Sequence, residues 1–261
     1  MFYYDLHCHT SLSKDSPADL RQTIHLAKER GLTGIAVTDH NKTYQGATEM
    51  DGIEIIPGNE ITVKGGGHLL AYFIREEISL GEEIITVIGK IKKEGGYAVL
   101  AHPFRKGPHS WINLKEEKEV EKVLELIDGL ESGNGSDSEE ERELTRKLAQ
   151  KTGLIECAGS DLHIPGQVGF SFVAVKERLN SQNFKRVMKE AKIIIRPEAE
   201  LFRRKIAPWK GMILGTAKLM GIYNNRILKG LFLRVVVKNY FRLENRKLKK
   251  IQFNLNNGDL N

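Results

Sequence analysis

The sequence has little cysteine and no long apolar run. Its 261 residues include two cysteines, Cys8 and Cys157, which lie far apart and form no CxxC pair. This spacing excludes a disulfide framework and a zinc finger built on cysteine ligands, so we expect two reduced thiols. No stretch approaches the roughly 20 apolar residues that a membrane-spanning helix needs, and the N-terminus leaves no room for a signal peptide before its first histidines. We therefore expect a cytoplasmic protein without a membrane span.

Acidic residues are scarce near the C-terminus. Residues 201–261 contain fourteen lysines and arginines against two acidic residues, a balance of +12, whereas residues 1–200 have a balance of −6. We therefore expect two parts, a body of residues 1–200 and a basic, helical C-terminal extension of residues 201–261. Three roles for the extension stay open. It could bind nucleic acid, its helix Ala207–Lys229 could lie on an anionic membrane or a partner, or it could pack on the body.

Short β-branched runs alternate with amphipathic stretches through the body. The expected strands are Phe2–Cys8, Gly34–Thr38, Ile53–Ile56, His68–Ile74, Tyr97–Ala101, Ile127–Leu130, Glu156–Gly159 and Phe170–Val175. The expected helices are Pro17–Arg30, Glu82–Glu94, Lys115–Leu126, Ser138–Lys151 and Asn183–Glu190. Ser16 before Pro17 predicts one helix start, and Ser138 with Glu141 fits a capping box. This alternation predicts an α/β fold with a mostly parallel sheet, closed into a distorted barrel of about seven repeats.

Most of the histidines fall where these strands begin or end. His7 and His9 are two residues apart in DLHCHT, so on a strand both point to the same face while Cys8 points away. Asp5 would share that face, as a ligand or as the group that holds a histidine tautomer. GSDLH repeats the spacing with Asp161 and His163. The other candidate positions are His40 in TDHN, Glu60 in GNEIT, His68 in GGGHLL and His102 in AHPFR.

These residue types point to a metal centre. Imidazole and carboxylate without thiolate suit Zn, Mn or Fe, and strand ends converge at the C-terminal rim of a β/α barrel. This number of donors could fill two or three adjacent sites, and clustered metal ions commonly activate water against a phosphate.

The motifs DLHCHTSLSKDS, TDHN, GNEIT, AHPFR and GSDLH resemble, in order and spacing, those of the PHP (polymerase and histidinol phosphatase) superfamily. The resemblance covers about residues 1–200. It implies a distorted seven-stranded β/α barrel with two or three divalent metal ions. His7, His9, Glu60 and Asp161 would hold one ion, with Glu60 bridging to a second ion on His68 and His102, and Asp15, His40 and His163 would hold a third.

Two positions depart from the family pattern. His68 follows Glu60 by only eight residues, which fits a short-loop phosphatase branch. Beyond His102 some members supply a further ligand, and here Glu131 or Asn134 would occupy or line that place.

The resemblance also implies a reaction. A metal-activated hydroxide would attack phosphorus in line, and Arg105 would grip a phosphate oxygen through its planar fork. His163 could protonate the leaving oxygen. We therefore expect hydrolysis of phosphomonoesters, with nucleotides or short oligonucleotides as substrates. The alternatives are a 5′-directed exonuclease guided by residues 201–261, and a catalytically silent binding module. His25 and His109 are expected to lie outside the site.

Overall fold

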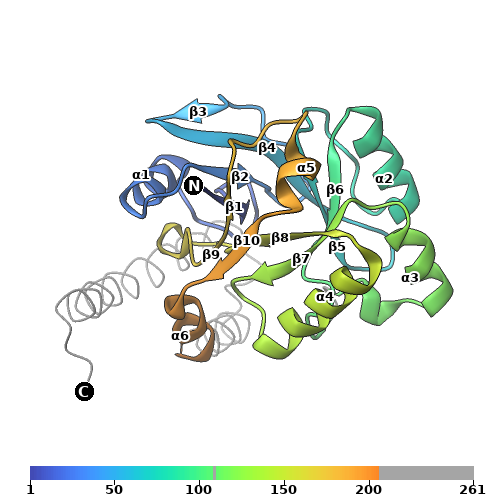
Figure 1. Cartoon of the computed structure of the whole chain (residues 1–261). Helices are drawn as coiled ribbons and strands as arrows, with labels where there is room; N and C mark the ends of the chain where they lie inside the picture. Colours follow the sequence, from blue (N-terminus) through green and yellow to red (C-terminus); the bar gives the residue numbers. More distant parts are fainter. Residues whose placement is uncertain (108–109, 206–261) are drawn as a thin grey trace, which may run out of the picture. The chain divides into compact units, whose positions relative to one another are not determined.

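The computed structural model describes residues 1–107 and 110–205 of the chain (Figure 1). The chain divides into two units, Met1–Arg203 and Arg204–Asn261, and the sheet and the candidate site lie in the first. His109 and the expected basic helix Ala207–Lys229 lie outside the described residues.

A single ten-stranded sheet, nearly closed into a barrel, organises the described part of the chain (Figure 1). Its strands are β1 (Phe2–Cys8), β2 (Gly34–Val37), β3 (Glu49–Met50), β4 (Ile53–Thr62), β5 (His68–Tyr72), β6 (Tyr97–Leu100), β7 (Gly129–Asn134), β8 (Ile155–Gly159), β9 (Ser171–Val175) and β10 (Lys192–Ile195). They are ordered β10-β9-β1-β2-β4-β5-β6-β7-β8, and β3 pairs with β4. The expected α/β barrel is thus confirmed, while β3 and β10 were not foreseen.

The expectation of a mostly parallel sheet is wrong for the middle and one edge. Parallel pairs join β1 to β2, β2 to β4, β6 to β7 and β7 to β8. The pairs β4–β5, β5–β6, β1–β9 and β9–β10 are antiparallel. The connection between β4 and β5 spans only residues 63–67, which include three glycines. A connection this short allows a hairpin but not the crossover helix that a parallel pair requires.

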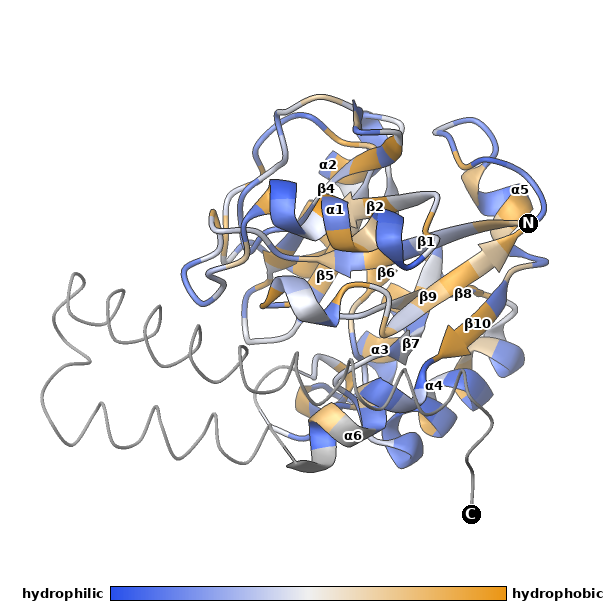
Figure 2. Cartoon of the chain, turned by 90° about the vertical axis from the view of Figure 1, so that its left-hand side faces the viewer, coloured by the Kyte–Doolittle hydropathy of each residue, from blue (hydrophilic) through white to orange (hydrophobic). Residues whose placement is uncertain are grey.

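Helices cover the sheet and close one end of the barrel. They are α1 (Leu20–Glu29), α2 (Ile84–Lys93), α3 (Glu117–Leu124), α4 (Glu139–Thr152), α5 (Phe184–Met188) and α6 (Pro197–Lys205), with short 3-10 turns at Ile112–Leu114 and Pro165–Gln167. In Figure 2, α4 carries both hydrophobic and hydrophilic residues, as expected for a helix with one face against a sheet. Among the described residues, the helices are too short or too polar to traverse a lipid bilayer.

Two helix starts test the expected capping. The box at α4 is confirmed, because Ser138 caps the backbone of Glu141 and the Glu141 side chain accepts from the Ser138 backbone. The start at Ser16 is wrong. Asp19 caps α1 by accepting from the backbone of Gln22 at 2.9 Å, and the Ser16 hydroxyl donates to the carbonyl of His163 at 3.0 Å instead.

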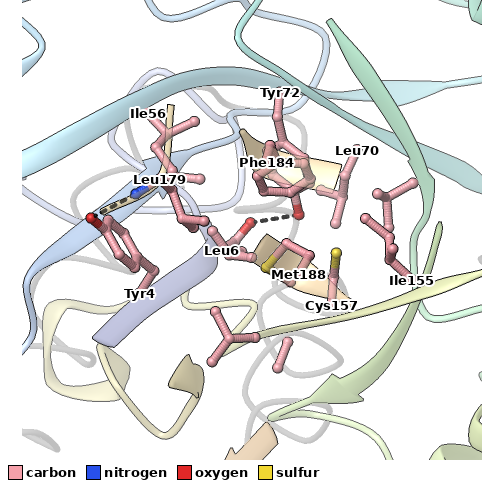
Figure 3. Close-up of a cluster of buried hydrophobic side chains, with 14 of the residues drawn as sticks. Tyr4, Leu6, Ile56, Leu70, Tyr72, Ile155, Cys157, Leu179, Phe184 and Met188 are labelled. Carbon is pink, nitrogen blue, oxygen red and sulfur yellow. Dashed lines mark hydrogen bonds between the residues drawn. The ribbon is translucent and has the colours of Figure 1, made fainter. Parts of the chain in front are cut away.

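The barrel interior is filled by side chains, as Figure 3 shows for Tyr4, Leu6, Tyr72 and Phe184. The Tyr72 hydroxyl donates to the carbonyl of Leu6 at 3.0 Å inside this cluster. Phe184 of α5 packs against Tyr97, the first residue of β6, so α5 plugs the end of the barrel at which the parallel strands begin. Burial of each of these large side chains stabilises the fold by about 2–3 kcal/mol. The polar residues His7 and Glu60 lie at the opposite end of the barrel.

Candidate metal centre

Glu60 of β4 forms the middle of a cluster of histidines, and its carboxylate is 1% exposed. Its Oε1 atom lies 2.9 Å from Nδ1 of His68 and 3.0 Å from Nε2 of His102. Its Oε2 atom faces a different set of rings. Because the two oxygens of one carboxylate point at separate groups of nitrogen donors, Glu60 has the arrangement of a ligand shared between two cations.

The first group of donors surrounds Oε2 of Glu60. Nε2 of His7 lies 3.5 Å from this oxygen and 3.7 Å from Oδ1 of Asp161. Nε2 of His9 lies 3.4 Å from the same Glu60 oxygen and 3.3 Å from the same Asp161 oxygen. Four donors held about 2.1 Å from one centre in a tetrahedron would be about 3.4 Å apart. The spacing of these four side chains therefore fits a divalent cation between them.

Unsatisfied nitrogens support this fit. Nε2 of His7 and Nε2 of His9 are buried and have no hydrogen-bond partner within residues 1–107 and 110–205. Buried polar atoms in proteins nearly always have partners. Two imidazole nitrogens aimed at the same pair of carboxylates are explained by an ion that they would share.

His68 and His102, which lie near Oε1 of Glu60, form the second group of donors. A third group lies at the more open side of the cluster. Nδ1 of His40 is 2.8 Å from Oε2 of Glu60, and its Nε2 is 3.6 Å from Oδ2 of Asp15. Nε2 of His163 lies 3.1 Å from the same Asp15 oxygen. The rings of His40 and His163 also lie beside that of His9, at 4.5 and 4.4 Å between centroids. Asp15 is 51% exposed, so solvent reaches the cluster from this side.

The structure thus brings all nine expected ligand residues together. It also yields three overlapping triads whose donor atoms lie within 4.8 Å of one another, namely His7–His9–Glu60, His40–Glu60–His68 and His9–His40–His163. Their overlap joins the donors into one polar cluster.

Arg105 lies beside this cluster and is held by three neighbours. Its Nε donates to Asp137 at 2.7 Å, and its Nη2 contacts Oδ1 of Asn134 at 2.7 Å and Oδ2 of Asp161 at 2.8 Å. The third nitrogen, Nη1, makes none of these contacts. The Arg105 side chain is 21% exposed, so a fixed guanidinium lies beside Asp161 of the cluster and remains partly open to solvent.

Local backbone geometry aims the side chains. The register of β1 against β2 shifts between Asp5 and Cys8, since three steps along β1 match two along β2. This β-bulge breaks the alternation of faces along β1. Asp5 therefore does not join His7 as expected: its carboxylate accepts from the backbone of Ser160 and Gly169, each at 2.8 Å, and among the described residues it has no hydrogen bond with a histidine ring.

Two other residues of the cluster adopt strained backbone conformations. His102 has φ of +29° and Asp161 has φ of +52°, a region that non-glycine residues rarely occupy. Such strain persists where the surrounding structure imposes it, and it concentrates at functional sites. Gly159 permits the close approach of β8 to β1, because a Cβ there would lie 2.3 Å from the backbone nitrogen of His7.

Charges within the cluster shift the pKa values of its members. Burial raises the pKa of Glu60, but the neighbouring His68, His7 and His40 outweigh burial and hold it well below its ordinary value. Burial lowers the pKa of His40, whereas Glu60 and Asp15 raise it to about 10. In the absence of a metal, protons on His7 and His40 help to balance the buried carboxylates. Protons and divalent cations therefore compete for the same donors.

The sequence did not reveal every residue that supports the site. Glu131, which with Asn134 was expected to occupy or line a ligand position, accepts from the ring of His7 at 2.8 Å. Asp137, which holds Arg105, was not foreseen. Its signal was its place between the end of β7 and the N-cap of α4, where a carboxylate meets the loop that carries Arg105.

Comparison with known proteins identifies a family for most of the chain. The model of the PHP domain family matches residues 5–207. An uncharacterized protein of Methanocaldococcus jannaschii, MJ1587, is 34% identical over 116 residues, a match that covers 38% of this chain and 67% of that protein.

Solved structures share the fold at low sequence identity. PsfC from Pseudomonas syringae has a TM-score of 0.60 and 15% identity, over 78% of this chain and 98% of PsfC. A two-domain protein from Bacteroides vulgatus, containing a predicted PHP-like metal-dependent phosphoesterase, has a TM-score of 0.55 and 20% identity over 74% of this chain. The lesion-specific endonuclease PfuEndoQ from Pyrococcus furiosus has a TM-score of 0.57 and 18% identity over 74% of this chain. The chain spans 64% and 57% of these last two proteins.

Proposed function

The chain belongs to the PHP domain family, whose members hydrolyse phosphoester bonds, and we propose that it is a metal-dependent phosphoesterase acting on phosphomonoesters. Nucleotides and the phosphorylated ends of short oligonucleotides are the proposed substrates. The observation that carries this proposal is the carboxylate of Glu60, whose two oxygens face separate sets of imidazole nitrogens. One carboxylate shared by two sets of donors is the arrangement expected for a polynuclear centre.

The proposed ligands follow the three groups of donors. The first ion would be held by His7, His9, Glu60 and Asp161, the second by Glu60, His68 and His102, and the third by Asp15, His40 and His163. The donor set contains only imidazole and carboxylate, which suits Mn, Zn or Fe. When bound, such ions supply a nucleophile at neutral pH and neutralise the charge of the phosphate.

Arg105 would bind and orient the phosphate. Its contacts with Asp137 and Asn134 fix the guanidinium plane, so binding a phosphate oxygen requires little further ordering of the side chain. A guanidinium whose plane is already oriented, and whose Nη1 lies outside these contacts, favours one approach of the phosphorus atom toward the cluster. His163 borders the open side, and in a state without the third ion its Nε2 could deliver a proton to the leaving oxygen.

A second candidate function is a nuclease that acts on a longer strand. The observation that favours it is the +12 balance of residues 201–261, which would attract a nucleic-acid backbone. PfuEndoQ, which shares the fold, is a lesion-specific endonuclease.

One experiment separates these functions. Phosphate release is measured with the Mn-reconstituted full chain on histidinol phosphate, AMP, 3′,5′-bisphosphoadenosine and 5′-phosphorylated oligonucleotides. A matched variant replaces five basic residues of the extension with glutamine, at Arg242, Arg246, Lys247, Lys249 and Lys250. Glu60→Gln serves as the inactive control, and oligonucleotide fragments are followed by gel electrophoresis.

Release from small monoesters that survives the five substitutions supports the phosphatase. Activity confined to oligonucleotides, steeply weakened by salt and by the substitutions, would establish the nuclease instead. If the chain binds metal but releases no phosphate from any substrate of the panel, the binding module becomes the favoured function.

A further inference from the structure

Ser13 lies between two of the proposed ligand groups and is only 2% exposed. It belongs to the loop after β1. Its hydroxyl oxygen lies 2.6 Å from Oδ1 of Asp39, 2.9 Å from the backbone nitrogen of His40 and 3.2 Å from Nδ1 of His9. Three polar atoms thus converge on one buried hydroxyl.

The proton of this hydroxyl goes to Asp39. The Asp39 carboxylate is fully buried and also accepts from the backbone of Thr10 at 2.7 Å, from the Thr10 hydroxyl at 2.7 Å and from the backbone of Ser13 at 3.1 Å. With the Ser13 hydroxyl, four donors point at it, so the carboxylate acts purely as an acceptor. A hydrogen bond to a carboxylate is about twice as strong as one between neutral groups.

The remaining contacts of Ser13 then follow from its lone pairs. A hydroxyl offers one proton and two acceptor positions. The backbone N–H of His40 can only donate, so it takes one lone pair. The second lone pair faces Nδ1 of His9, which must therefore carry a proton. Neutral imidazole has one N–H, so Nε2 of His9 is left with its lone pair exposed to the cluster.

We propose that Ser13, oriented by Asp39, is a positioning residue that fixes the tautomer of His9 and presents its Nε2 to a divalent cation. Nε2 lies 3.4 Å from Oε2 of Glu60 and 3.3 Å from Oδ1 of Asp161. An unprotonated nitrogen facing two carboxylate oxygens is repelled unless a cation lies between them. The opposite tautomer would need the Ser13 proton to turn from Asp39 to Nδ1 of His9, which would break the stronger hydrogen bond.

The neighbouring proposed ligand, His7, also has an acceptor that holds its Nδ1 atom. Nδ1 of His7 contacts the carboxylate of Glu131 without an intermediate. On His9 a hydroxyl is interposed, and the same hydroxyl holds the backbone of His40. Ser13 therefore links a ligand of the first proposed ion to a ligand of the third. The inference rests on the proposed function for its catalytic consequence, but the tautomer can be measured independently of any activity.

The test is a two-bond ¹H–¹⁵N correlation spectrum of the full chain labelled with ¹⁵N-histidine, recorded at pH 8 without metal and then with Zn²⁺. The His9 signals are identified by their loss in His9→Gln. The variants are Ser13→Ala, Ser13→Cys and Ser13→Thr, with Ser11→Ala as control because Ser11 is exposed on the same loop. Cysteine fills the volume of serine but accepts hydrogen bonds only weakly.

In the wild type and Ser11→Ala we expect a proton on Nδ1 of His9, and Zn²⁺ on its Nε2. Ser13→Ala and Ser13→Cys should lose this preference and bind Zn²⁺ about 10–100-fold more weakly, while Ser13→Thr should retain it. A His9 ring that keeps its Nδ1 proton in both Ser13→Ala and Ser13→Cys, with unchanged Zn²⁺ affinity, would overturn the inference. If the spectra show the expected tautomers but no phosphoester is hydrolysed, the proposed function is wrong and the positioning role of Ser13 is still supported.

Discussion

Nδ1 of His7 lies 2.8 Å from Oε1 of Glu131, and both side chains are completely buried. The residues are 124 positions apart and come from β1 and β7. The other oxygen of Glu131 accepts from the backbone of His102 at 2.9 Å and from Nδ2 of Asn134 at 3.0 Å. Glu131 therefore holds the ring of one proposed ligand, His7, and the backbone of a second, His102, which would belong to two different metal ions.

We predict that Glu131→Ala weakens metal binding about 10–100-fold, because the His7 ring loses the acceptor that holds it. Glu131→Gln, which keeps one acceptor oxygen, should lose less. Metal affinity is measured by competition with a chromogenic chelator. Glu156→Gln, on the adjacent strand β8, is the control, since Glu156 accepts from Ser132 at 2.5 Å and, within the described part of the chain, has no hydrogen bond with a proposed ligand. Wild-type affinity in Glu131→Ala would contradict the orienting role.

The sequence predicted the ligand cluster because its signals are local. His7 and His9 have the period of a strand, and Glu60 and His102 fall at or near the ends of predicted strands. Any barrel that aligns those ends brings the side chains together, whatever its exact register. The roles assigned to each ligand, and the role of residues 201–261, stay predictions.

The supporting contacts could not be predicted because they depend on register and on distant neighbours. The β-bulge in β1 turns Asp5 away from His7, and no local pattern in DLHCHT marks it. The partner of His7 is Glu131, which requires knowing that β1 and β7 face each other across the barrel. The strand β10 reads as a short apolar run whose pairing with β9 depends on the closure of the sheet.

Glu60→Gln tests whether one carboxylate serves two ions. An amide has only one acceptor oxygen, so we expect the chain to lose at least one bound ion and to retain about 1% or less of wild-type activity. Metal content is measured by mass spectrometry after gel filtration. Glu54→Gln is the matched control on the same strand, because Glu54 contacts Tyr4 and Arg178 away from the cluster. An unchanged metal content in Glu60→Gln would exclude the bridging role.

Arg105→Ala should weaken phosphate binding more than metal binding. We expect kcat/KM to fall on the order of 10²–10³-fold, mostly through KM, and inorganic phosphate to inhibit less, because the fixed guanidinium is lost. Arg105→Lys should recover only part of this, since an ammonium cannot reproduce the planar fork. Lys106→Ala is the control, with a side chain that is 81% exposed. Equal KM values in Arg105→Ala and the wild type would place Arg105 outside the substrate site.

The stability of the metal-free protein should depend on pH through His9. Burial and the neighbouring His163 lower the pKa of His9 from 6.5 to about 4, despite the opposing effect of Asp161. Between pH 6.5 and 4 the unfolded chain binds a proton at His9 that the folded chain does not. The contribution of His9 to the free energy of unfolding is therefore complete above pH 6.5 and is lost as the pH falls toward 4. A shift of this size corresponds to a loss on the order of 3 kcal/mol.

Urea unfolding in the presence of EDTA, from pH 7 to 4.5, measures this loss. His9→Gln should flatten the slope in that window, because glutamine does not titrate. His25→Gln should preserve it, since His25 lies on the exposed face of α1 and contacts only Glu29 in the described structure. A slope that survives in His9→Gln would assign the acid sensitivity to another group. Excess Zn²⁺ should shift the loss to lower pH in the wild type, because the cation then competes with the proton for the Nε2 atom that the fold keeps unprotonated.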